Sequence, residues 1–192
     1  MTLTDAQIDR YSRQIIVPHI GGRGQERLLA ARILLCGDAS DIEAPLAYLV
    51  GAGVGSIRLK LSGDQSVFTE KRDLNADVSV TIADGSKSRI DLAFVIIGSS
   101  AARKIAEEIA NDRDVRALVI AQLDAPGKIL VIPDAHGPRT IGTGFGTRAE
   151  AADFIAMLAT AEAFKLIAGY AENPSRAVIE LDGYQTRVRI HS

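Results

Sequence analysis

The residues with the clearest chemical potential follow a glycine that ends an apolar run. The run is Arg32–Gly37, and Asp38, Asp41 and Glu43 come directly after it. A glycine between a buried strand and a helix is a common anion site, because first-turn amides are free and the helix dipole favours negative charge. Two unit charges 4 Å apart repel by about 1 to 4 kcal/mol near a surface. These three acids therefore oppose the binding of phosphate at this turn.

The same segment contains a pattern for capping its own helix. Ser40 and Glu43 have the spacing of a capping box, in which both side chains bond backbone amides of the first turn. We therefore predict a self-capped helix start over residues 37–45 rather than an open cradle for an anion. The residues of this degenerate loop are Gly37, Asp38, Ala39, Ser40 and Asp41.

Other residue types that support catalysis or metal binding are few. The single cysteine, Cys36, lies inside the apolar run, where a thiol is an inert, small apolar side chain. One cysteine excludes an intrachain disulfide and a cysteine-based zinc site within the chain. His19, His136 and His191 have no metal-ligand spacing. We predict no catalytic residue and no metal ligand.

Composition indicates an ordinary globular protein. The 192 residues are 47% apolar and 24% charged, which fits one domain with a substantial core. The formal charge of −2 gives no reason to expect nucleic acid or an anionic membrane as a partner. Residues 1–11 lack the layout of a signal peptide, and no apolar run reaches membrane-spanning length. We expect a cytoplasmic protein.

Hydrophobic periodicity predicts alternating helices and strands. The predicted helices cover residues 4–17, 22–30, 42–50, 101–111 and 148–168. The predicted strands cover residues 32–37, 56–61, 78–82, 92–97, 118–120 and 128–132, with a terminal hairpin of residues 177–181 and 186–190. This order favours an α/β fold: a doubly wound, mainly parallel, Rossmann-like sheet with antiparallel edge strands and an N-terminal helical segment. We predict one domain over residues 1–192, made of N-terminal helices (1–31), a Rossmann-like core (32–135) and a long helix with the hairpin (136–192).

A motif near the N-terminus is shared with a known family. Residues 10–16 read RYSRQII and residues 24–28 read GQERL, followed by a strand, a helix and GAGVG at residues 51–55. Weaker matches follow at residues 47–49, 74–78 and 161–166. The chain resembles the ThiF/MoeB/HesA family, relatives of the ubiquitin-activating enzymes, over nearly its whole length. It resembles a degenerate member that is shortened between Leu61 and Leu74.

The resemblance implies a chemistry and a set of site residues. Family members bind ATP·Mg and adenylate the C-terminal glycine of a ubiquitin-like or sulfur-carrier protein, and they are dimers or pseudo-dimers. The family places an acid for the ribose at the tip of the second strand, where this chain has Lys60 and Leu61, with Asp64 nearby. It places another acid, for magnesium, after the fourth strand, where residues 95–102 contain none.

The second arginine of the RYSRQ motif is the family element that persists here. In homodimeric members this arginine reaches across the dimer to the partner's ATP phosphates, and it corresponds to Arg13. A guanidinium suits that role because its charge is permanent and its donors form a fork. The resemblance therefore assigns partner contact to Arg13, Tyr11 and Gln14. The alternative for Arg13 is a pairing with an acid at a helix–helix contact.

Three functions are consistent with these features. The leading hypothesis is a non-catalytic pseudoenzyme without a cofactor, which acts as a dimeric partner or scaffold and lends Arg13 to an active paralogue. The alternative is an ATP-dependent adenylyltransferase that uses ATP and Mg. A second alternative is a small neutral or cationic ligand in the strand-end crevice near Asp38 and Asp41. The expected partners are a second copy or an active family paralogue, and a ubiquitin-like or sulfur-carrier protein.

Overall fold

The structure, a computed structural model, describes most of the chain. The described residues are 2–63, 74–85, 89–112, 114–134, 146–170, 175–182 and 185–191. Two residues considered above, Asp64 and His136, lie outside these ranges.

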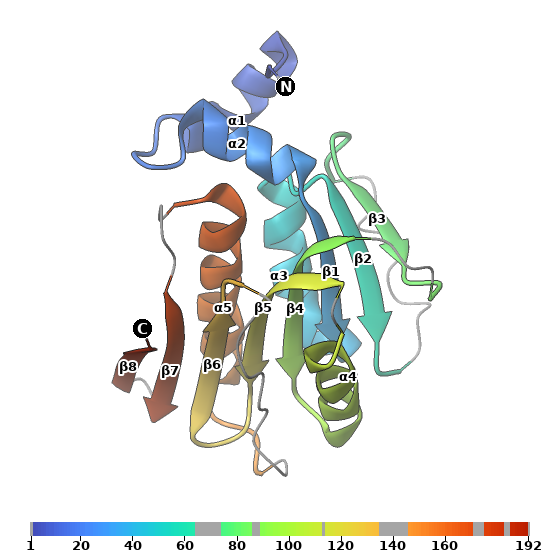
Figure 1. The fold of residues 1–192 in the computed structure, drawn as a ribbon, viewed down its shortest axis with the longest axis vertical. Coiled ribbons are helices and arrows are strands. Elements are labelled where there is room, and N and C mark those ends of the chain that lie inside the picture. Colours follow the sequence, from blue (N-terminus) through green and yellow to red (C-terminus); the bar gives the residue numbers. More distant parts are fainter. Residues whose placement is uncertain are drawn as a thin grey trace.

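A single mixed sheet forms the centre of the molecule (Figure 1). Among the described residues it has eight strands in the order β3-β2-β1-β4-β5-β6-β7-β8. The strands are β1 (Arg32–Gly37), β2 (Ser56–Leu61), β3 (Ser79–Ile82), β4 (Ile90–Ile97), β5 (Val115–Gln122), β6 (Gly127–Ile132), β7 (Arg176–Asp182) and β8 (Gln185–His191). The neighbours from β3 to β5 are parallel, and β6, β7 and β8 continue the sheet antiparallel. The predicted α/β class and antiparallel edge are confirmed.

Helices cover both faces of the sheet, as a doubly wound fold requires. They are α1 (Asp5–Ile15), α2 (Gly21–Ala30), α3 (Ala39–Gly51), α4 (Ser100–Ala110) and α5 (Ala152–Ala168). Helices α3 and α5 pack on one face and α4 on the other, while α1 and α2 lie together at one end of the molecule (Figure 1). Within the described ranges, no helix is long and apolar enough to cross a membrane.

The two faces of β1 show why its sequence is apolar without alternation. Ile33 and Leu35 point into the core layer beneath α3 and α5, whereas Leu34 and Cys36 point into the layer beneath α4. A parallel strand that is buried on both faces needs apolar side chains at every position. The predicted bounds of β1 match the observed ones for this reason, and those of β2 match because its buried apolar residues alternate with polar ones.

Two helices begin at positions that differ from the prediction. Helix α3 begins at Ala39, three residues before the predicted start, because Asp38 already takes the N-cap position. Helix α5 begins at Ala152, four residues after the predicted start at Arg148. Arg148 instead forms an isolated β-bridge with Asp124, which keeps its backbone extended.

Candidate functional site at the strand ends

The turn between β1 and α3 brings the end of β1 very close to β4. Gly37 has φ +150°, and a Cβ at this position would lie 2.7 Å from the backbone oxygen of Ile96 and 2.9 Å from Ile42 Cγ2. Only glycine fits such a close backbone approach. The one glycine retained in this loop therefore has a structural reason to be there.

Asp38, the single residue between β1 and α3, links three strand ends. Its Oδ1 accepts hydrogen bonds from the Ser62 hydroxyl, just after β2, and from Ser99 Oγ at 3.0 Å, just after β4. Its side chain makes no capping bond to the first turn of α3. The carboxylate of Asp38 therefore lies across the carboxyl ends of β2, β1 and β4.

The predicted capping box at Ser40 and Glu43 is wrong. Ser40 already lies inside the first turn of α3, because Asp38 is the N-cap residue. The amides of Asp41 and Ile42 bond the backbone oxygen of Asp38 at 3.0 and 3.1 Å. Among the described residues, the amides of Ala39 and Ser40 have no acceptor. The first turn thus keeps two donors that no side chain of the described part of the chain occupies.

Asp41 supplies a carboxylate at the end of β4. Its side chain is 5% exposed, and Oδ1 lies 2.9 Å from Arg148 Nη2. The other oxygen packs on Gly98, where an added Cβ would lie 1.6 Å from it. Burial raises the pKa of Asp41, while the nearby Arg148 acts in the opposite direction. Arg148 also lies 3.4 Å from Asp153, so two carboxylates share its guanidinium.

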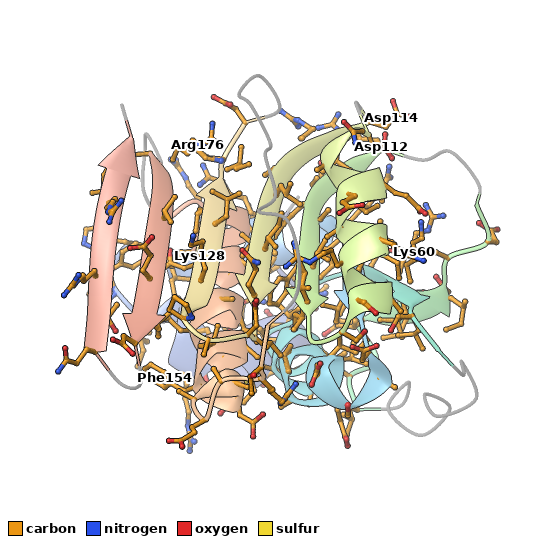
Figure 2. All side chains as sticks on the ribbon, turned by 90° about the horizontal axis from the view of Figure 1, so that it is seen from below. Lys60, Asp112, Asp114, Lys128, Phe154 and Arg176 are labelled. Carbon is orange, nitrogen blue, oxygen red and sulfur yellow. The ribbon has the colours of Figure 1, made fainter. Side chains whose placement is uncertain are left out.

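The tip of β2 carries no acid of its own. Lys60 points toward α4, where its Nζ lies 2.6 Å from Glu108 Oε2 (Figure 2). Leu61 is buried in the core. Among the described residues, the acid that reaches this strand end is Asp38, which is bonded to Ser62. The sequence predicted that both family acids are missing, but it did not predict that Asp38 and Asp41 place carboxylates near the same two strand ends.

The remaining chemical candidates are Cys36 and the acidic, histidine and cysteine side chains that could bind a metal ion. Cys36 is fully buried, and burial raises the pKa of its thiol to about 12. In the ranges that the structure describes, no three His, Cys, Asp or Glu side chains are grouped so that they could hold a metal ion.

The three residues assigned to partner contact have different environments. Tyr11 is 1% exposed and bonds Asn75 and Asp77 of its own chain, so its side chain does not offer a surface for a partner. Arg13 is exposed, and among the described residues it has no ion pair, so the predicted alternative of an acid at a helix contact is not found. Gln14 is half-buried and lines a cavity of about 640 Å³ between α1, α3 and α5.

Some residues of these contacts were missed in the sequence. Arg148 was predicted only as the first residue of a helix, so nothing in the sequence pointed to its pairing with Asp41. Asn75 and Asp77 were noted only as part of a weak family match at residues 74–78, and that match was their one available signal. Their contacts with α1 depend on the tertiary structure.

An open, mainly parallel sheet with helices on both faces and polar groups at the carboxyl ends of β1, β2 and β4 defines a Rossmann-like class of fold. Comparisons with known proteins agree. A crystal structure of E. coli MccB with ATP superposes with a TM-score of 0.66 over 95% of this chain and 71% of that chain, at 15% identity. At this identity the likeness concerns the fold alone.

Relatives by sequence narrow the class. The SAMP-activating enzyme E1 of Haloferax volcanii is 33% identical over 122 residues, which cover 52% of this chain and 45% of that protein. The sulfur carrier protein adenylyltransferase of Thermus thermophilus is 47% identical over 58 residues, which cover 30% of this chain and 21% of that protein. No protein-family model matches the chain.

The chain is similar to the ThiF/MoeB/HesA family, with sequence similarity to curated relatives over about half of its length. It spans less than half the length of these curated relatives. The names of these relatives are those of an activating enzyme and of an adenylyltransferase for a sulfur carrier protein.

Proposed function

We propose that this protein acts in the ATP-dependent adenylation of the C-terminus of a ubiquitin-like or sulfur-carrier protein, as a dimer in which Arg13 contacts the partner subunit. The observation that carries the proposal is the first turn of α3. The amides of Ala39 and Ser40 have no acceptor among the described residues, and they lie at the carboxyl end of β1. Free amides at a helix N-terminus are suited to a phosphate group. The names of the relatives support the same chemistry.

The carboxylates of Asp38 and Asp41 also suit a nucleotide with its magnesium ion. Mg²⁺ is usually held by one or two carboxylates, with phosphate oxygens and water as its other ligands. Asp41 at the end of β4 would supply one such carboxylate, and Arg148, which pairs with it in this structure, would supply positive charge for the phosphates. Asp38 and the hydroxyl groups of Ser62 and Ser99 are acceptors and donors for ribose.

A second candidate function is the non-catalytic partner or scaffold, and the charge of the same turn favours it. Asp38 and Asp41 bring two negative charges to the α3 N-terminus, and Arg148 offsets only one of them. ATP brings several more, and each close pair of like charges costs about 1 to 4 kcal/mol near a surface. In this case the protein would lend Arg13 to an active family member without binding ATP itself.

The third reading, a small neutral or cationic ligand at the strand ends, is not favoured. Asp38 already accepts hydrogen bonds from Ser62 and Ser99, and Asp41 already pairs with Arg148. A neutral ligand gains little there, because it would have to displace a partly buried ion pair without replacing its charge.

Calorimetry with ATP·Mg separates the two candidates. We expect binding at micromolar affinity for the adenylating protein and none for the non-catalytic partner. The variant Ser40→Pro removes one amide donor, and proline is tolerated in the first turn of a helix. We expect it to weaken ATP binding by about tenfold, in line with the loss of one charge-assisted hydrogen bond.

The matched control is Ser40→Ala, which keeps the amide and should bind ATP like the wild type. Equal binding by Ser40→Pro and Ser40→Ala would show that phosphate does not use this turn. If the wild type does not bind ATP·Mg at all, the non-catalytic reading is tested next by adding the protein to an active family member. Adenylation by that member should then depend on Arg13 and fall with Arg13→Ala.

A further inference from the structure

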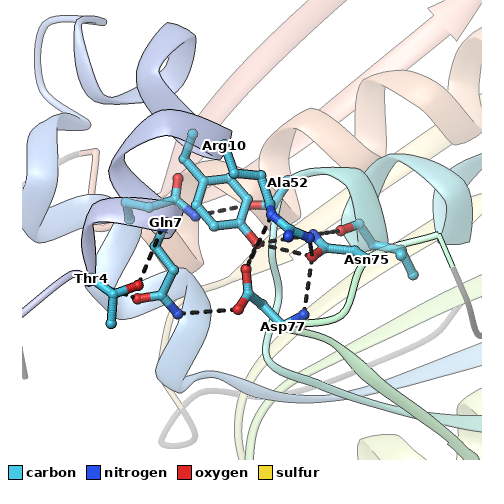
Figure 3. Close-up of polar contacts among 9 residues, drawn as sticks. Thr4, Gln7, Arg10, Ala52, Asn75 and Asp77 are labelled. Carbon is cyan, nitrogen blue, oxygen red and sulfur yellow. Dashed lines mark hydrogen bonds and ion pairs between the residues drawn. The ribbon is translucent and has the colours of Figure 1, made fainter.

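Helix α1 is held on the domain mainly by polar contacts. Tyr11 is the one buried residue among its eleven. Gln7, Arg10 and Tyr11 are spaced so that they share one face of the helix, and that face points at the segment just before β3 (Figure 3). An isolated helix of this length is marginal in water, so its position depends on these contacts.

Asn75 links α1 to α3 and to its own segment before β3. It is 4% exposed, and its Oδ1 accepts from Arg10 Nη1 at 2.8 Å and from the amide of Asp77 at 3.1 Å. Its Nδ2 donates to the Tyr11 hydroxyl and to the backbone oxygen of Val50 in α3, each at 2.9 Å. The side-chain amide of Asn75 therefore uses both of its ends, and no smaller polar side chain could make these bonds together.

The carboxylate of Asp77 contacts three side chains of α1. Its Oδ2 accepts from the Tyr11 hydroxyl at 3.0 Å and lies 3.5 Å from Arg10 Nε, and its Oδ1 accepts from Gln7 Nε2 at 3.2 Å. Burial raises the pKa of Tyr11, so the hydroxyl stays protonated and donates to the carboxylate. The hydroxyl accepts from Asn75 at the same time, which fixes the direction of the ring.

The ring of Tyr11 packs on bare backbone at Gly53. This glycine has φ +82°, and a Cβ there would lie 2.6 Å from Tyr11 Cζ. While Tyr11 points inward, Arg13 is exposed and, in the described part of the chain, has no ion pair. The contacts that bury Tyr11 therefore leave Arg13 available to another molecule.

We propose that Asn75 and Asp77 are positioning residues that hold α1 in one orientation and so present Arg13 to a partner subunit. The presentation of Arg13 rests on the proposed function, whereas the fixed orientation of α1 does not. Because a guanidinium binds its target through a fork of defined direction, a helix that pivots would present it poorly.

The orientation of α1 is tested with two spin labels on the full chain. Ser12→Cys on α1 and Lys104→Cys on α4 are exposed attachment points, and the native Cys36 is fully buried and does not compete. We expect a narrow distance distribution in the otherwise unchanged protein. Asp77→Asn should broaden it at least twofold, and Tyr11→Phe, which removes only the hydroxyl, should broaden it less.

The matched control is Asp9→Asn, which removes one negative charge from the exposed side of α1 and leaves the contacts with Asn75 and Asp77 intact. Its distance distribution should equal that of the parent. A narrow distribution in both Asp77→Asn and Tyr11→Phe would overturn the proposal. Hydrogen exchange in the central strands of the same samples must be unchanged, which separates loss of α1 from global unfolding.

Presentation of Arg13 is tested with a second copy of the chain as the partner, by sedimentation over a concentration series. We expect Arg13→Ala and Asp77→Asn each to weaken self-association about tenfold, and the double variant to be no weaker than Arg13→Ala alone. Additive losses would show that Asp77 does not act through Arg13. A monomeric wild type would reject a second copy as the partner, and the spin-label distances would still decide whether the Asn75–Asp77 pair orients α1.

Discussion

Gly37 and Asp38 together decide how the carboxyl ends of three strands meet. Gly37 lets the end of β1 approach β4 without a side chain between them, and Asp38 then reaches Ser62 and Ser99 on either side. A charged residue in this position is stabilised by the N-terminus of α3, because the helix dipole favours negative charge there. The negative charge of Asp38, which bonds the two neighbouring strand ends, would also repel a phosphate group at this turn.

At the residue scale, Gly37→Ala should destabilise the protein by about 2 to 4 kcal/mol, because its Cβ would overlap the backbone of β4. Gly63→Ala is the matched control, since a Cβ at that position meets nothing within 4 Å. Urea unfolding of both variants measures the difference. Equal midpoints would mean that β1 and β4 separate readily at this turn.

Asp41 should make the stability of the protein depend on pH. Its folded-state pKa is raised above the ordinary value of 3.8, so in the window from that value up to the raised pKa the folded state binds more protons than the unfolded state. Stability contributed by Asp41 is therefore present at the acidic end of the window and is lost as pH rises through it. Asp41→Asn should remove this part of the dependence.

The measurement is the difference in unfolding free energy between wild type and Asp41→Asn across a series of pH values. Asp153→Asn is the control, because Asp153 shares Arg148 but its side chain is fully exposed. A difference between wild type and Asp41→Asn that stays constant with pH would contradict the raised pKa.

At the scale of elements, the strand-end turn also fixes the start of α4. Ser99 is the N-cap of α4: its hydroxyl accepts from the amide of Ala102 at 3.2 Å and donates to Asp38 at 3.0 Å. Ser100 is the first residue of the helix proper. A single side chain therefore couples α4 to the β1–α3 turn.

We expect Ser99→Ala to cost about 1 kcal/mol of stability, the usual loss for an N-cap serine, with a further loss from the bond to Asp38. Ser100→Ala should be neutral or slightly stabilising, because alanine is the better helix former inside the first turn. Thermal or urea unfolding of the two variants gives the comparison. A larger loss from Ser100→Ala would place the cap one residue later.

At the scale of the whole molecule, the sheet separates two apolar layers that share the same strands. Leu46 of α3 lies in one layer and Ile109 of α4 in the other. Because β1, β4 and β5 contribute side chains to both layers, neither layer can unfold while the strands of the other stay in place.

We therefore expect one cooperative unfolding transition, in which Leu46→Ala and Ile109→Ala each cost about 2 to 4 kcal/mol. Unfolding is followed by circular dichroism, which reports the helices, and by tyrosine fluorescence, which reports the environments of the four tyrosines, Tyr11 among them. Coincident curves for all three proteins support the shared sheet. A variant that separates the two curves would show that one layer unfolds alone.

The sequence alone determined the order and class of the elements, because apolar runs and helical periodicity are local properties of the chain. The bounds of β1 and β2, the antiparallel edge and the family resemblance at RYSRQII were all predictable in this way. The absence of reactive chemistry at Cys36 also follows from its place in a buried run.

Only the tertiary structure decided how the polar residues are used. Asp38, Asp41 and Arg148 meet because three strand ends and a distant crossover converge, and a local pattern gave the wrong cap at Ser40. Asn75 and Asp77 bond side chains of α1 that are more than sixty residues away in the sequence. Side-chain pairing between distant segments depends on the packing of the whole fold, which short-range periodicity does not encode.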